Sequence, residues 1–157
     1  MMFRKDKTMF SGKKTYDKDA PKIKKIDSFE IITLHLSGMR YTQDFEFTPD
    51  GENTRLVLYG YRYRQDGHDR VPEQIAVRPT DEVLDILNDC DVGKWSGFHG
   101  AHPPHVLDGT MFRLSGTVNG GVELHADGSE NFPPNYRKFT DYLYEKIHEG
   151  EKVGENE

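Results

Sequence analysis

Residues 29–64 decide the fold, and they read FEIITLHLSGMRYTQDFEFTPDGENTRLVLYGYRYR. Apolar and polar side chains alternate strictly from Tyr41 to Thr48, which is the pattern of a strand with one buried face. The flanking stretches 29–37 and 55–64 alternate in the same way, and residues with turn chemistry separate the three stretches. We therefore expect three antiparallel strands in succession.

A second pair of strands is expected on either side of Asn119, and the register of this hairpin can be derived. A loop of two residues, Asn119 and Gly120, would place Leu114 on the same face as polar residues of the next strand, which would split the core. A loop of three residues that also includes Gly121 places Leu114 opposite Ala126 and supplies the glycines of a bulged turn. The sequence predicts the three-residue loop.

Two amphipathic helices complete the predicted fold. The first begins at Thr80 and the second follows Pro133-Pro134, and each has one apolar stripe. The stripes are Val83, Leu84, Leu87 and Cys90 in the first helix, and Tyr136, Phe139, Leu143 and Ile147 in the second. The order of elements predicts an α+β domain, in which an antiparallel sheet of about five strands carries both helices packed on one face.

The charge is distributed unevenly along the 157 residues, whose formal net charge is −6. Residues 1–26 contain nine basic and three acidic residues and show no apolar period, so we interpret them as a disordered basic arm. An arm that folds back on the acidic remainder is the alternative. A single domain is expected over residues 27–148, followed by an acidic disordered tail at 149–157.

Several classes of protein are disfavoured by the sequence. The single Cys90 excludes an internal disulfide, and no apolar run approaches the roughly 20 residues of a membrane span. The first ten residues lack the apolar core of a secretory signal, so a cytoplasmic location is expected. Nucleic-acid binding is not expected, because alternation puts Tyr59, Tyr61 and Tyr63 on the face opposite to Arg62 and the body is acidic.

Two groups of residues are candidates for a site. His99, His102 and His105 lie within seven residues, and neutral imidazoles bind Zn and other divalent transition metals, with Asp108 or Cys90 as a further ligand. The alternative is an exposed loop without a physiological metal. Trp95 and Phe98 form an aromatic pair in a glycine-rich loop, which indicates either a lid on the core or an anchor at an interaction surface.

Three segments around the second strand pair resemble parts of a widespread set of small bacterial domains. The segments are WSGF at 95–98, VLDGT at 106–110 and DGSENFPPNY at 127–136. Domains of that set are single α+β units, mostly uncharacterised, and some occur in lipoproteins. The resemblance covers about residues 29–148, and it implies the fold without implying a reaction.

The sequence contains no constellation with catalytic spacing and predicts no cofactor other than the metal of the histidine loop. We therefore expect a non-enzymatic binding or protein-interaction domain, whose acidic body contacts a basic protein surface or a second copy of the chain. One alternative is a metal-binding protein or metal-dependent enzyme that uses His99, His102 and His105. Another is an acidic immunity or inhibitor protein that occupies a basic cleft of its partner.

Overall fold

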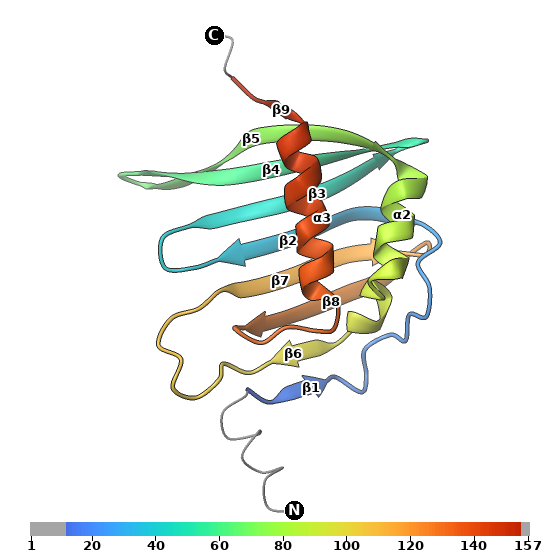
Figure 1. Ribbon diagram of the computed structural model, residues 1–157, viewed down its shortest axis with the longest axis vertical. Helices are drawn as coiled ribbons and strands as arrows, with labels where there is room; N and C mark the ends of the chain where they lie inside the picture. Colours follow the sequence, from blue (N-terminus) through green and yellow to red (C-terminus); the bar gives the residue numbers. More distant parts are fainter. Residues whose placement is uncertain (1–11, 155–157) are drawn as a thin grey trace, which may run out of the picture.

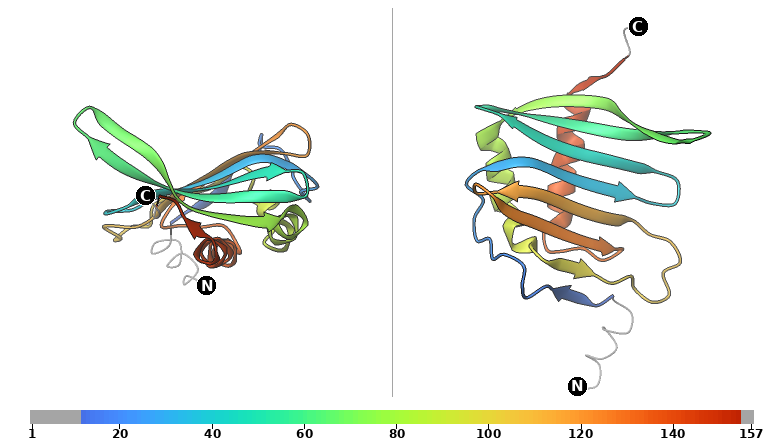
Figure 2. Two further views of the ribbon diagram at one scale, coloured as in Figure 1. Left: turned by 90° about the horizontal axis from the view of Figure 1, so that it is seen from above. Right: turned by 180° about the vertical axis from the view of Figure 1, so that it is seen from behind.

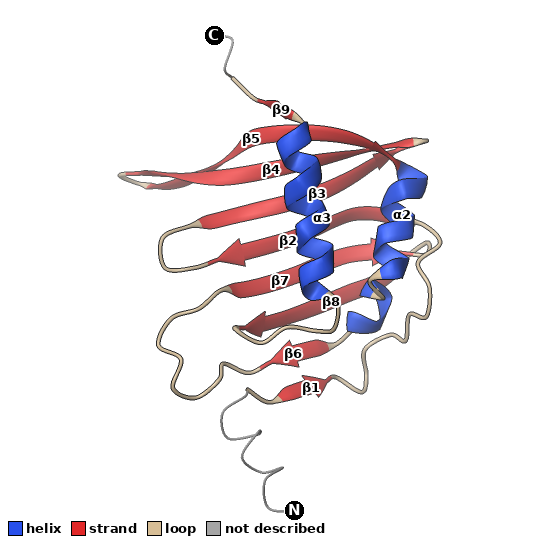
Figure 3. Ribbon diagram, viewed as in Figure 1, coloured by secondary structure: helices blue, strands red, loops and turns tan. Residues whose placement is uncertain are grey.

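The computed structural model describes residues 12–154, and these form one nine-stranded sheet with two α-helices (Figure 1, Figure 3). The strand order is β1-β6-β8-β7-β2-β3-β4-β5-β9. The strands are β1 (Lys14–Tyr16), β2 (Phe29–Ser37), β3 (Thr42–Asp50), β4 (Asn53–Arg64), β5 (Gly67–Pro79), β6 (Phe98–Gly100), β7 (Met111–Val118), β8 (Val122–Ser129) and β9 (Glu151–Lys152). The helices are α2 (Thr80–Asp89) and α3 (Tyr136–Glu149), and a short 3-10 helix, η1, spans Val92–Trp95.

The expected antiparallel sheet of about five strands is wrong, because the described residues form nine strands and the sheet is mixed. β6 pairs with β8 in parallel, whereas the other neighbours are antiparallel. The strands that the sequence does not predict are β1, β6 and β9, with three, three and two residues, and the first part of β5. β1, β9 and residues 67–73 of β5 are almost wholly exposed, so they carry no hydrophobic alternation that sequence reasoning can detect.

Both ends of the described chain differ from the disordered segments that the sequence predicts. In the basic arm, β1 pairs with β6, and Ile23 and Ile26 are buried in the core. Asn88 of α2 fixes this segment by accepting a hydrogen bond from the Ile26 N–H and donating one to the Ile26 carbonyl. Residues 12–26 therefore fold back on the body, while 1–11 lie outside the described residues. At the other end β9 pairs with β5, and 155–157 lie outside the described residues.

The predicted register of the second hairpin is confirmed. Leu114 lies opposite Ala126, and the loop between β7 and β8 contains three residues. Those residues, Asn119, Gly120 and Gly121, have φ angles of 51°, 77° and 135°. Positive φ is a conformation that glycine and asparagine adopt readily, which explains why this sequence turns here.

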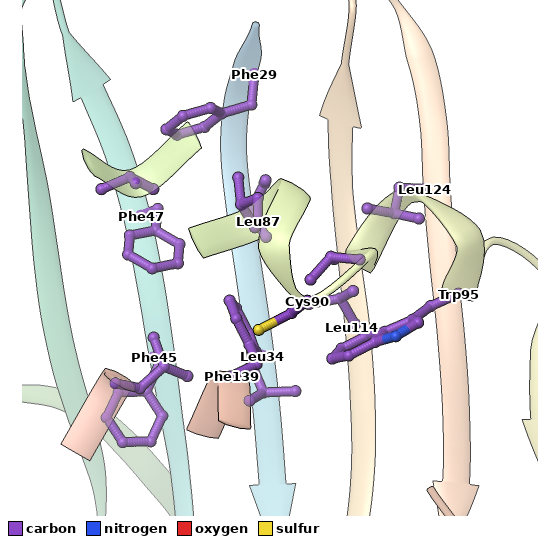
Figure 4. Packing of buried hydrophobic residues seen from close by; sticks show 14 of the residues in the cluster. Phe29, Leu34, Phe45, Phe47, Leu87, Cys90, Trp95, Leu114, Leu124 and Phe139 are labelled. Atoms are coloured by element: carbon purple, nitrogen blue, oxygen red, sulfur yellow. The ribbon is translucent and has the colours of Figure 1, made fainter. Parts of the chain in front are cut away.

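The core lies between the sheet and the two helices. Alternate residues of the central strands, among them Leu34 and Phe45, face Leu87 of α2 and Phe139 of α3 (Figure 4). Both helices lie on the same side of the sheet, as the view along the sheet shows (Figure 2). The other side, which we call the open face, is covered by neither helix and displays the remaining side chains of each strand, such as His35 and Arg113.

An ion pair ties the helices to the end of the sheet. Arg78 of β5 donates to both carboxylate oxygens of Glu82 in α2, at 2.8 Å and 2.5 Å, and the Tyr142 hydroxyl of α3 donates to the same carboxylate at 2.7 Å. The hydrogen bonds from Arg78 lower the pKa of Glu82 to about 2, although burial opposes this shift.

We expect the substitution Glu82→Gln to lower the free energy of unfolding at neutral pH by about 1 kcal/mol, a value discounted for the partial exposure of both side chains. Because the folded-state pKa is depressed, this contribution is complete above the ordinary value of 4.5 and is lost as the pH falls toward 2. Urea unfolding at about pH 7 and pH 3 measures it, with Glu52→Gln as an exposed control. A deficit that is equal at both pH values would contradict the assignment.

Candidate ligand-binding site

A line of polar side chains crosses the open face from β6 to β4. Residues in register on neighbouring strands project from the same side of a sheet, and each residue in this line is in register with the next. We call this line the polar row. In spatial order its members are His99, Asp127, Arg113, His35, Asp44 and Tyr59.

Asp44 is the most buried member of the polar row, with 4% of its surface exposed. Its carboxylate lies 2.5 Å from Nδ1 of His35 and accepts hydrogen bonds from the Tyr61 hydroxyl at 2.7 Å and from Nε of Arg70 at 2.8 Å. Burial alone raises the pKa of Asp44, but the hydrogen bonds from Tyr61, His35 and Arg70 outweigh it and leave this pKa below its ordinary value. Asp44 is therefore an anion that orients His35.

Asp127 plays a similar part at the other end of the polar row. One carboxylate oxygen lies 2.5 Å from Nδ1 of His99, and the other lies 3.2 Å from Nε2 of His125. An ionised carboxylate only accepts hydrogen bonds, so Nδ1 of His99 and of His35 carries a proton. Within residues 12–154, Nε2 of His35 and Nε2 of His99 have no hydrogen-bond partner.

β6 can lie beside β8 because two glycines leave room for the turn that follows β8. A Cβ atom added at Gly100 would lie 2.3 Å from the carbonyl oxygen of Asn131, and one added at Gly128 would lie 2.2 Å from the same oxygen. Those glycines are also in register with each other. The close approach of these backbones places His99 directly beside Asp127.

Arg113, at the centre of the polar row, makes no hydrogen bond or ion pair with any described residue. It lines a pocket of about 440 Å³ on the open face, together with His35, Ser37, His99, His102 and Asp127. A larger cavity of about 540 Å³ lies where β9 and the end of α3 meet β5, but its Lys146 is paired with Glu149. The pocket at Arg113 therefore combines a cavity with an unneutralised cation, which makes it the candidate site.

The three histidines that the sequence proposes as metal ligands have different surroundings in the structure. His99 is bound to Asp127, whereas His102 is held by the Ser129 hydroxyl at 2.7 Å and the Val106 carbonyl at 2.5 Å. His99 and His102 line the pocket but His105 does not, and Cys90 is buried in the core on the helix side. Among residues 12–154, no three His, Cys, Asp or Glu side chains are grouped so that they could hold a metal ion.

Trp95 and Phe98 belong to the core and not to an interaction surface. Each side chain is 1% exposed. The Trp95 indole donates its N–H to the carbonyl of Pro134 at 2.9 Å and meets the Phe139 ring edge-on. Both rings are therefore buried in the core of the described residues.

The structure is that of an α+β protein with the polar row and a pocket on the uncovered face of its sheet. In comparisons with known proteins, no family model, no curated protein and no solved structure matches this chain. In the part of the chain that the structure describes, no helix has the length and apolar character needed to cross a membrane. The function of the pocket must therefore be argued from its own geometry.

Proposed function

We propose that the protein is a binding domain that holds an anionic ligand in the pocket around Arg113. The observation that carries this proposal is the unpaired guanidinium. Both carboxylates of the polar row are engaged by histidines or by Arg70, while Arg113 has no counterion within residues 12–154. Guanidinium groups bind carboxylates and phosphates through two parallel hydrogen bonds, so an anion would neutralise Arg113 without disturbing its neighbours.

Asp127 is not the counterion of Arg113, although the two residues lie opposite each other in the register. Its two oxygens are turned to His99 and His125, and no hydrogen bond joins it to the guanidinium. The imidazoles thus hold the carboxylate away from Arg113 and leave the guanidinium available to a ligand.

The geometry favours binding over catalysis. His35 on β2 and His99 on β6 are separated by β7 and β8, which corresponds to about 14 Å between their backbones at ordinary strand spacing. An acid and a base that act on one reacting group must both lie within hydrogen-bond reach of it. Two histidines so far apart are better suited to contact different parts of one bound molecule.

Nuclear magnetic resonance tests the proposal directly on the full chain. Titration with inorganic phosphate and with sulfate is expected to shift the Nε–H resonance of Arg113 and the amide of Gly128 along a saturable curve. Arg113→Ala is expected to weaken binding at least about tenfold. The matched control is Arg55→Ala, which removes an exposed, unpaired arginine on the same face but outside the pocket. Shifts that are absent, or equal in both variants, would refute an anion site at Arg113.

A further inference from the structure

We infer that the anionic ligand is a phosphate monoester, whose phosphate is held by Arg113, His35 and Ser37. This inference rests on the proposed anion site and names the class of ligand. The strand register carries it: Arg113 lies opposite His35, and Met111 lies opposite Ser37. Residues in register are about 5 Å apart, and residues two apart on one strand face the same side. The three side chains therefore project from neighbouring positions on the same side of the sheet, and we call them the triangle.

Each corner of the triangle has an unused hydrogen-bonding group. Arg113 has no partner among the described residues, and neither the Ser37 hydroxyl nor Nε2 of His35 has one. A carboxylate has only two oxygens, and in a fork both of them face the guanidinium, so it has no third oxygen to present to His35 and Ser37. A tetrahedral phosphate can accept two hydrogen bonds from Arg113 and still present a third oxygen to the other two corners.

Proton chemistry separates phosphate from other tetrahedral anions. Because Nδ1 of His35 donates to Asp44, Nε2 of the neutral ring is an acceptor, and it needs a proton from the ligand or from solvent. The monoanion of a phosphate monoester carries a proton on one oxygen, which it can donate to the lone pair of Nε2. A sulfonate has no such proton and meets a lone pair at Nε2. The site should therefore prefer phosphate over sulfonate.

The remaining volume indicates that the phosphate carries an organic group. A cavity of about 440 Å³ is much larger than a phosphate, and it extends from the triangle to His99, Gly100 and His102 on β6 and the following loop. The phosphate position also lies beside two anions, Asp44 and Asp127. Asp44 is compensated by Arg70 and His35, and Asp127 is hydrogen-bonded by two imidazoles. A small phosphorylated compound fits this arrangement, with its organic part toward β6.

Isothermal titration calorimetry of the full chain tests the inference with phenyl phosphate, benzenesulfonate and benzoate. Each of these three probes carries one phenyl ring, and they differ only in the anionic group. We expect phenyl phosphate to bind the wild-type protein about tenfold more tightly than either of the others, and more tightly than inorganic phosphate. His35→Asn is expected to remove the preference while residual, Arg113-dependent binding of all three persists. His148→Asn, an exposed histidine of α3 outside the pocket, is the control and should keep the preference.

The outcomes distinguish this inference from the proposed function. If the three probes bind equally and Arg113→Ala abolishes all binding, the anion site stands and the phosphate assignment is overturned. If inorganic phosphate binds as tightly as phenyl phosphate, the organic group is overturned. If none binds, both proposals fall.

Circular dichroism checks that His35→Asn is folded. Ser37→Ala is an independent second variant that removes one hydroxyl from the open face. It should weaken the binding of phenyl phosphate more than the binding of the other two probes.

Discussion

Replacement of Trp95 by alanine is expected to lower the free energy of unfolding by about 3 to 5 kcal/mol, the largest stability effect predicted for this chain. The side chain is 1% exposed, and its ring packs against Phe139 of α3 at a centroid distance of 5.6 Å. Its indole N–H also satisfies the carbonyl of Pro134 just before α3. Truncation would leave a large cavity where η1, α3 and β8 meet, and it would leave that carbonyl without its partner.

Chemical denaturation of the variant at neutral pH measures this effect. Trp95→Phe should recover most of the loss, because it restores the ring contact but not the hydrogen bond. Tyr63→Ala is the matched control, since it removes a large aromatic ring that is 79% exposed, and it should change stability by less than about 0.5 kcal/mol. A loss at Trp95 as small as that at Tyr63 would mean that this aromatic residue is not part of the core.

Replacement of Asp44 by asparagine is expected to lower the free energy of unfolding by about 2 to 3 kcal/mol at neutral pH. The variant removes the closer of the two carboxylates that pair with Arg70, which keeps Glu46 at 3.4 Å. It also weakens the bonds to Tyr61 and His35 on the open face. Because the pKa of Asp44 is lowered in the folded state, its contribution is complete above the ordinary value of 3.8 and is lost as the pH falls below it.

Urea unfolding of Asp44→Asn across this pH range gives the measurement. The wild type should lose its advantage over the variant as the pH falls below about 4, whereas the exposed Asp66→Asn should resemble the wild type throughout. The same variant should also weaken phenyl phosphate binding, because Asp44 orients His35. A stable variant with unchanged ligand preference would remove Asp44 from both roles.

The long elements could be predicted because burial leaves a period in the sequence. β2 has the bounds 29–37 that the sequence predicts, and the apolar stripe of α3 supplies the buried residues Phe139, Leu143 and Ile147. β6 has only three residues, and β9 has two, so neither is long enough to show an alternation. β8 extends to Ser129, where it pairs with Met111 of β7.

The candidate site was far less accessible to prediction. The sequence predicts His99 as a metal ligand, and the structure adds that Nδ1 of His99 is hydrogen-bonded to Asp127. His35, Asp44 and Arg113 all occupy polar positions of predicted strands, and such positions usually face solvent without any further role. The signal that could have been noticed is a histidine and two charged residues in the interiors of strands, but their proximity depends on which strands are neighbours.

Local pattern by itself determined the positions of the main strands, the two amphipathic helices and the register of the β7–β8 hairpin. It could do so because one buried face imposes a period of 2 on a strand and 3.6 on a helix, and because positive φ selects glycine and asparagine. The tertiary structure alone decided the strand order, the short outer strands and the polar row. Backbone pairing between distant segments uses groups that every residue has, so no side-chain pattern records which segments will meet.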